Sequence, residues 1–122
     1  MQHTFNLLAV TLMGVPLIAT AQSAADYPVK PVREIVPTAT GAATDLQARL
    51  LAQKLSASFK RSFVIENRTG AGYTAGYEIV SKAAPDGYTL MASSVAITFV
   101  PALRPDLPLD PSRDFAPVSL VA

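Results

Sequence analysis

The sequence predicts an α/β fold: a parallel sheet with flanking helices. Short β-branched or apolar segments at residues 32–37, 62–66 and 88–92 alternate with helical patterns at 44–59 and 74–84. Alternating strand and helix patterns are typical of parallel sheets whose strands are joined by right-handed crossovers. The chain has 122 residues, half of them apolar, which is the size of one small domain.

The composition excludes several classes of function. A net charge of +1 and the lack of a basic run do not favour nucleic acid or an anionic membrane surface as partner. The chain has no cysteine and its one histidine is His3, so thiolate chemistry is absent and a metal site or cofactor is not expected. No G-x-S-x-G elbow or nucleophile–base spacing indicates catalysis.

Residues 1–25 have the pattern of a secretory signal peptide. They contain no charged side chain apart from His3, and the apolar run from Phe5 to Ala21 is shorter than the roughly 20 residues that a spanning helix needs. Small residues follow, so we expect cleavage after Ala21 or after Ala25. Because the run begins without Lys or Arg, the signal is atypical or the true start lies upstream. A buried N-terminal helix is the alternative.

Residues 35–46 are the centre of the prediction. The β-branched residues between Val32 and Val36 predict a buried strand, which Pro37 ends. A turn of small residues follows, and then a helix is expected from Thr44 to about Phe59. The apolar residues spaced to fill its inner face are Leu46, Leu50, Leu51, Leu55 and Phe59.

The turn at residues 38–44 is expected to seat an anion. It has no large side chain, and the first amides of a helix lack partners within it and lie at the positive end of its dipole. In the simpler alternative the turn is only a connection, in which Thr44 caps the helix and Asp45 complements the dipole. The residues predicted to bind a ligand here are Thr40, Gly41, Ala42, Thr44 and Asp45.

Two further loops are expected at the same edge of the sheet, because ligands of parallel sheets bind outside the carboxyl ends of the strands. These loops are residues 68–74 and 93–98, both rich in small and hydroxyl-bearing residues. Tyr73 can line a cleft or be an ordinary half-buried aromatic residue, and Arg68 can assist binding or form a surface ion pair with Glu66. The ligand-binding residues predicted from these loops are Gly72, Tyr73, Thr74, Ser93 and Ser94.

The glycines of the second loop do not form a nucleotide motif. Gly70 and Gly72 begin as G-x-G, but Gly76 is one place late for G-x-G-x-x-G, and no G-K-[ST] follows. Further along, Asp110 is expected to cap a helical turn that starts at Pro111 within an irregular, proline-rich stretch. Residues 118–121 predict the start of a fourth strand, and the chain then stops.

Several runs resemble the solute-binding receptors of tripartite tricarboxylate transporters, the Bug proteins. The similarity covers essentially all of the segment after residue 25. The runs that carry it are Tyr27–Arg33, Ile35–Pro37 with Gly41 and Thr44-Asp45, Val64–Arg68 with Gly70-Ala71-Gly72, Pro85–Leu90, and Leu109–Pro111 with Arg113–Val118.

The resemblance implies that residues 26–122 are the first lobe of a periplasmic-binding-protein-like (type II) two-lobed fold, incomplete at its C-terminus. It implies a periplasmic receptor that captures a small organic acid and delivers it to membrane permease subunits, with no catalytic residue. The alternatives are a lobe of an α/β enzyme whose catalytic residues lie beyond Ala122, or a degenerate remnant. Where the family's first loop reads Pro-Gly-Gly, this chain has Thr40-Gly41-Ala42, a departure that bears on ligand identity.

Overall fold

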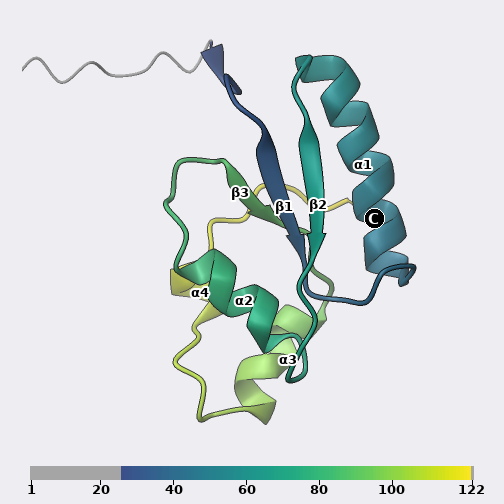
Figure 1. Cartoon of the computed structure of the whole chain (residues 1–122). Coiled ribbons are helices and arrows are strands. Elements are labelled where there is room, and N and C mark those ends of the chain that lie inside the picture. The colour runs from purple at the N-terminus through teal and green to yellow at the C-terminus, as the bar shows by residue number, and fades with distance from the viewer. Residues whose placement is uncertain (1–25, 122) are drawn as a thin grey trace, which may run out of the picture.

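The computed structural model describes residues 26–121; the predicted signal peptide lies outside the described residues and stays a prediction. This part of the chain has three strands and four helices, which alternate up to α3, and α4 then follows α3 directly (Figure 1). No helix in the described range is both long and apolar enough to cross a membrane. In order, the elements are β1 (Val32–Val36), α1 (Ala43–Phe59), β2 (Phe63–Asn67), α2 (Thr74–Ser81), β3 (Thr89–Met91), α3 (Ala96–Leu103) and α4 (Pro111–Asp114).

The strands form one parallel sheet in the order β2-β1-β3, which confirms the predicted fold class. The central strand β1 carries the core: Val32, Ile35 and Val36 are fully buried. The chain passes from β1 to β2 through α1, and then from β2 to β3, on the other side of β1, through α2. Because both crossovers are right-handed, α1 and α2 lie on opposite faces of the sheet. The strand order therefore reverses at β1, which is where sheets of this kind open a crevice for a ligand.

The predicted inner face of the first helix is wrong in part. Leu46, Leu50 and Phe59 are exposed, by 59%, 58% and 44%, while Leu51 and Leu55 are half-buried. The fully packed positions are instead Asp45, Ala48 and Ala52. The small alanines let α1 lie close to the sheet, and Asp45 is drawn inward by the hydrogen bonds described below. Because consecutive helical residues are about 100° apart around the axis, turning Asp45 inward carries Leu46 outward.

The C-terminal part differs from prediction in two places. Residues 96–103 form the helix α3, which includes Pro101 of the stretch expected to be irregular, and residues 118–121 form no strand. Val118 and Leu120 are 85% and 90% exposed, since a strand needs a neighbour to pair its backbone groups and none of the described strands pairs with them. The cap is confirmed: the Asp110 carboxylate accepts from the Ser112 amide at 3.0 Å.

Glu34 is a buried acid in the middle of β1. It is 4% exposed, and its Oε2 has no hydrogen-bond partner among the described residues. Burial raises the pKa of the Glu34 carboxyl, because removing the charged form from water is unfavourable. Its neighbours in the strand register are Ile65 and Leu90, so an apolar side chain suits this position.

We therefore expect Glu34→Leu to raise the free energy of unfolding at pH 7 by about 1–3 kcal/mol, the cost of an unsatisfied buried group. Because the folded-state pKa of Glu34 is raised, its contribution is most favourable at low pH and is lost as the pH rises past the ordinary value. Urea unfolding at several pH values between 4 and 8 (about half-unit steps) tests this. Glu78→Leu, on the exposed side of α2, is the control, and a destabilised Glu34→Leu contradicts the argument.

Gly76 lets α2 approach the end of β1. A Cβ built on Gly76 would lie 2.7 Å from the Cβ of Pro37 and 3.3 Å from the carbonyl oxygen of Arg68. Gly76→Ala is therefore expected to destabilise the fold by about 1–3 kcal/mol through overpacking, although alanine is normally the better helix former. Thermal unfolding measures the change, with Glu78→Ala in the same helix as control. A higher melting temperature for Gly76→Ala would show that α2 has room to move away.

Candidate functional site

The loops that follow the three strands meet at one edge of the sheet. Two hydrogen bonds extend the strand pairing into them: the Arg68 amide donates to the carbonyl of Val36 at 2.9 Å, and the Ala92 amide donates to that of Ile35 at 3.1 Å. The close contact of Gly76 with Pro37 joins the start of α2 to the first loop. The parallel sheet thus brings together the three loops from which the site residues were predicted.

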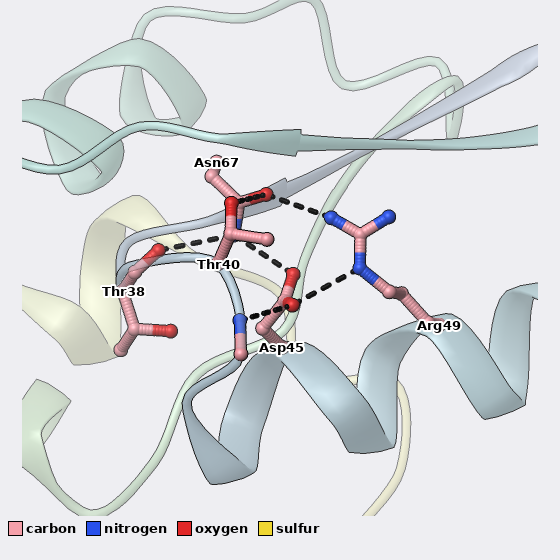
Figure 2. Close-up of polar contacts among 6 residues, drawn as sticks. Thr38, Thr40, Asp45, Arg49 and Asn67 are labelled. Atoms are coloured by element: carbon pink, nitrogen blue, oxygen red, sulfur yellow. Dashed lines mark hydrogen bonds and ion pairs between the residues drawn. The ribbon is translucent and has the colours of Figure 1, made fainter.

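A buried carboxylate organises the first loop (Figure 2). Asp45 is fully buried; its Oδ2 accepts from Arg49 Nε at 3.0 Å and from the Gly41 amide at 2.8 Å. Its Oδ1 accepts from Asn67 Nδ2 at 2.8 Å. These hydrogen bonds, that of Arg49 foremost, lower the pKa of Asp45 to about 2, so the group is ionised at neutral pH.

Asn67, the last residue of β2, fills the space between that carboxylate and the loop. Its Nδ2 donates to the carbonyl of Thr38 at 3.0 Å as well as to Asp45. Its Oδ1 accepts from Arg49 Nη2 at 3.0 Å and from the Thr40 hydroxyl at 3.2 Å. Sequence reasoning missed Asn67 and Arg49. The available signal was an Asn at the strand end opposite Val36 and an Arg one helical turn after Asp45.

The amides expected to hold the anion are partly used within the lobe. The Gly41 amide donates to Asp45, and the Ala42 amide donates to the carbonyl of Ala39 at 3.1 Å. The expectation that these two amides face a ligand is therefore corrected: in this structure they hold the turn closed. Asp45 likewise points inward with three donors on its two oxygens, so it supports the fold.

The helix begins one residue earlier than predicted, and Thr44 is not its cap. The cap position is Ala42, which has no side chain able to accept from the helix, and α1 starts at Ala43. Among the described residues, the amides of Ala43, Thr44 and Asp45 make no hydrogen bond. Because Asp45 has no exposed surface, only the amides of Ala43 and Thr44 can replace Gly41 and Ala42 as the donors that an anion would meet at the positive end of this 17-residue helix.

The second loop is shaped by its own hydrogen bonds. Gly72 and Tyr73 both have positive φ, 69° and 76°, and Tyr73 is 39% exposed at the start of α2. Thr74 is buried, and its hydroxyl donates to the carbonyl of Ala71 at 3.2 Å. Of the three predicted residues here, Tyr73 is therefore the one whose side chain is open to a ligand.

Arg68 forms the surface ion pair that sequence analysis gave as the alternative to a role in binding. Its Nη2 lies 2.8 Å from Glu66 Oε2, and Arg33 holds the other side of the same carboxylate at 2.8 Å. Together Arg33 and Arg68 lower the pKa of Glu66 to about 2. The Arg68 side chain is thus held by an acid of the lobe, which it shares with Arg33.

In the third loop, Ser93 and Ser94 follow β3. The hydroxyls of Ser93 and Tyr77 are 3.0 Å apart, which ties this loop to the fully buried tyrosine of α2. The Ser94 hydroxyl accepts from the Ala96 amide at 3.3 Å, at the start of α3, and remains exposed. The edge therefore offers hydroxyls and amides, while both nearby arginines, Arg49 and Arg68, are held by carboxylates.

A parallel sheet whose strand order reverses at β1, with neutral donors at its carboxyl edge, is the architecture in which lobes of the α/β class bind ligands. The family model described as "Tripartite tricarboxylate transporter family receptor" matches residues 47–122. The chain belongs to this family, which confirms the resemblance found in the sequence.

The relatives include BugT of Bordetella pertussis, 41% identical over 106 residues, which are 85% of this chain and 32% of BugT. A protein from the TAR-I ttuE-ttuC' intergenic region of Agrobacterium vitis is 38% identical over 120 residues, 98% of this chain and 35% of that protein. The chain thus spans about a third of the length of the curated relatives it matches.

Solved structures of similar proteins share the fold. MatC of Rhodopseudomonas palustris with bound malate is 38% identical, with a TM-score of 0.68 over 78% of this chain and 33% of MatC. Rpa4515 of R. palustris with adipate is 39% identical, with a TM-score of 0.58 over 59% of this chain and 24% of that protein.

The hydrogen-bonded carboxylates of Asp45 and Glu66 predict how the free energy of unfolding falls in acid. The folded-state pKa values of Asp45 and Glu66 are lowered, so their contributions are complete at neutral pH and are lost as the pH falls from their ordinary values near 4 to about 2. We expect Asp45→Asn to be less stable than the native chain at pH 7 but to lose less stability between these pH values. Urea unfolding at each pH measures both effects, with Glu78→Gln as control. An equal loss of unfolding free energy in acid for the native chain and for Asp45→Asn would contradict the lowered pKa of Asp45.

Proposed function

We propose that this chain is the N-terminal, ligand-binding lobe of a periplasmic receptor that captures a small organic carboxylate for a tripartite tricarboxylate-type transporter. One observation carries the proposal: the amides of Ala43 and Thr44 lack partners at the N-terminus of α1, on the edge of the sheet from which the three loops leave. A carboxylate placed there gains hydrogen bonds and the favourable end of the helix dipole without displacing an existing contact.

The similar proteins support a carboxylate as the ligand. MatC holds malate and Rpa4515 holds adipate, both dicarboxylic acids. We propose that the side chains which contact the ligand from this lobe include Thr44, Tyr73 and Ser94, because their loops leave the same edge of the sheet as the free amides. Asp45, Thr74 and Ser93 would act by holding those loops in place. The family membership supports export to the periplasm and delivery to permease subunits as the context of this binding.

The pKa values of the acids at this edge favour a binding lobe over a lobe of an enzyme. General acid–base catalysis needs a group whose pKa lies near the working pH. The pKa values of Asp45 and Glu66 are both about 2, and hydrogen bonds hold the two carboxylates in place. Neither acid is therefore suited to exchange a proton with a substrate at neutral pH.

The binding is tested by thermal unfolding of the chain with malate, adipate and neutral diols of the same carbon lengths. A ligand that binds only the folded state raises the melting temperature, by roughly 2.7 kcal/mol of stabilisation at a hundredfold excess over the dissociation constant. We expect a dose-dependent rise with at least one dicarboxylate and none with the diols. Equal curves with acids and diols would contradict the proposal.

Ala43→Pro tests the free amides directly. Proline at the first helical position removes an N–H that has no partner in the lobe, and Ala42 before it is already extended, with ψ 159°. The fold should therefore stay within about 0.5 kcal/mol of the native chain, while dicarboxylate affinity falls roughly tenfold or more, the worth of one hydrogen bond to a charged group. Ala43→Gly, which keeps the N–H, is the matched control, and calorimetry gives both affinities. Unchanged affinity in Ala43→Pro would place the anion elsewhere.

A further inference from the structure

We infer that Asp45 and Asn67 are positioning residues that hold the loop between β1 and α1 in its binding shape. The two side chains, with Arg49 beside them, form a unit that we call the loop latch. It joins the end of β2, the first turn of α1 and the loop itself (Figure 2). The meaning of the latch for a ligand rests on the function proposed above, whereas its effect on the loop stands on the contacts alone.

Every hydrogen-bonding position of the Asn67 side chain has a partner. A side-chain amide has two N–H donors and a carbonyl oxygen that accepts two hydrogen bonds. In Asn67 both kinds of position are filled: Nδ2 donates to the Thr38 carbonyl and to Asp45, and Oδ1 accepts from Thr40 and Arg49. A fully satisfied amide has one orientation, so Asn67 fixes the distance of the loop from the sheet. Neither Asp, which lacks the donors, nor Leu can replace it opposite the native carboxylate of Asp45.

Asp45 determines which amides of the loop face outward. Its Oδ2 holds the Gly41 amide at 2.8 Å, and Gly41 takes a φ of 88° that favours glycine. With that amide turned inward, the turn closes through Ala42 and Ala39, and the helix begins at Ala43. The contact of Gly41 with Asp45 therefore helps to fix where the helix begins, and the first amides of that helix, those of Ala43 and Thr44, are left free as at any helix start.

Arg49 makes the latch compatible with an anion nearby. A buried carboxylate in the first helical turn would by itself repel a carboxylate bound at the same helix end. Arg49 Nε lies 3.0 Å from Asp45 Oδ2, and its side chain is 46% exposed, so its charge offsets that of Asp45. The latch thus holds the loop by charged hydrogen bonds while adding no net charge to the site.

The test is a cycle of variants made in the chain: Asn67→Asp, Asn67→Leu, Asp45→Asn, and the double variant in which Asp45→Asn and Asn67→Asp exchange the amide and the carboxylate. The first readout needs no ligand: the hydrogen-exchange rate of the Gly41 amide, measured by NMR. We expect roughly tenfold faster exchange in each single variant at pH 7, corresponding to loss of one charged hydrogen bond. The exchanged pair restores the carboxylate–amide contact and should return the rate toward the native one.

The pH dependence separates positioning from general loss of packing. In Asn67→Asp two carboxylates face each other, so one of their pKa values rises and a shared proton restores a donor between them. Protection of the Gly41 amide should therefore recover on acidification toward pH 5, about one unit above the ordinary carboxyl value, whereas in Asn67→Leu it should not. Gln53→Ala, an exposed position of α1, is the control. Native Gly41 protection in Asn67→Leu, or equal pH profiles for the two Asn67 variants, would overturn the latch.

The second readout is affinity for malate or adipate, whichever binds the native chain. The single latch variants should lose roughly tenfold and the exchanged pair should recover most of it. Faster Gly41 exchange with unchanged affinity would overturn the link between latch and ligand. If no dicarboxylate binds the native chain, the proposed function fails, and the exchange rates still decide whether the latch positions the loop.

Discussion

The structure depends on one buried charge. Asp45 has no exposed surface, and its carboxylate can stay ionised there only because Arg49, Gly41 and Asn67 donate to it. Leaving such a charge without partners inside a protein is strongly unfavourable, so helix, loop and strand end are bound to one arrangement. The orientation of α1 follows from it: with Asp45 turned to the sheet, the alanines at 48 and 52 become the packing surface and the leucines at 46 and 50 lie in solvent.

The same constraint separates two roles at one helix end. The side chain of Asp45 holds the loop from inside, while the backbone amides of Ala43 and Thr44 have no partner at the start of the helix. The anion site proposed at these amides needs no free cation, because aligned dipoles and orphan N–H groups supply the attraction. With a pKa of about 2, the carboxylate of Asp45 is ionised near pH 7, where it accepts hydrogen bonds from three donors.

The sequence was sufficient for the first three strands, their parallel direction and the edge from which the loops leave, because β-branched runs, glycine turns and alternation are local signals. It was insufficient for the helix face. The prediction placed the leucines on the buried face of α1 because of their spacing. In the structure that face is determined by Asp45, whose hydrogen-bond partners include Gly41 and Asn67, the latter in another strand. The amides of Gly41 and Ala42 were predicted as free for the same reason: a bare turn looks open until the side chain beneath it is known. Residues 118–121 have the composition of a strand, but pairing with a neighbour decides whether a strand forms, and they have none in the described part.

The departure of the first loop from the Pro-Gly-Gly pattern of the family acquires a physical meaning from these contacts. Ala42 has φ −67° and ψ 159°, an extended conformation open to any residue, so a second glycine is not required there. Gly41 is the position that needs glycine, because its φ is 88° while its amide points to Asp45. Thr40 stands in place of proline and contributes a hydroxyl that donates to Asn67, which gives the turn a side-chain contact where proline would stiffen its backbone. The loop therefore keeps its shape through one glycine, one acid four residues later and one asparagine from the neighbouring strand. That set is spread over 27 residues of sequence and converges only when β1 and β2 pair.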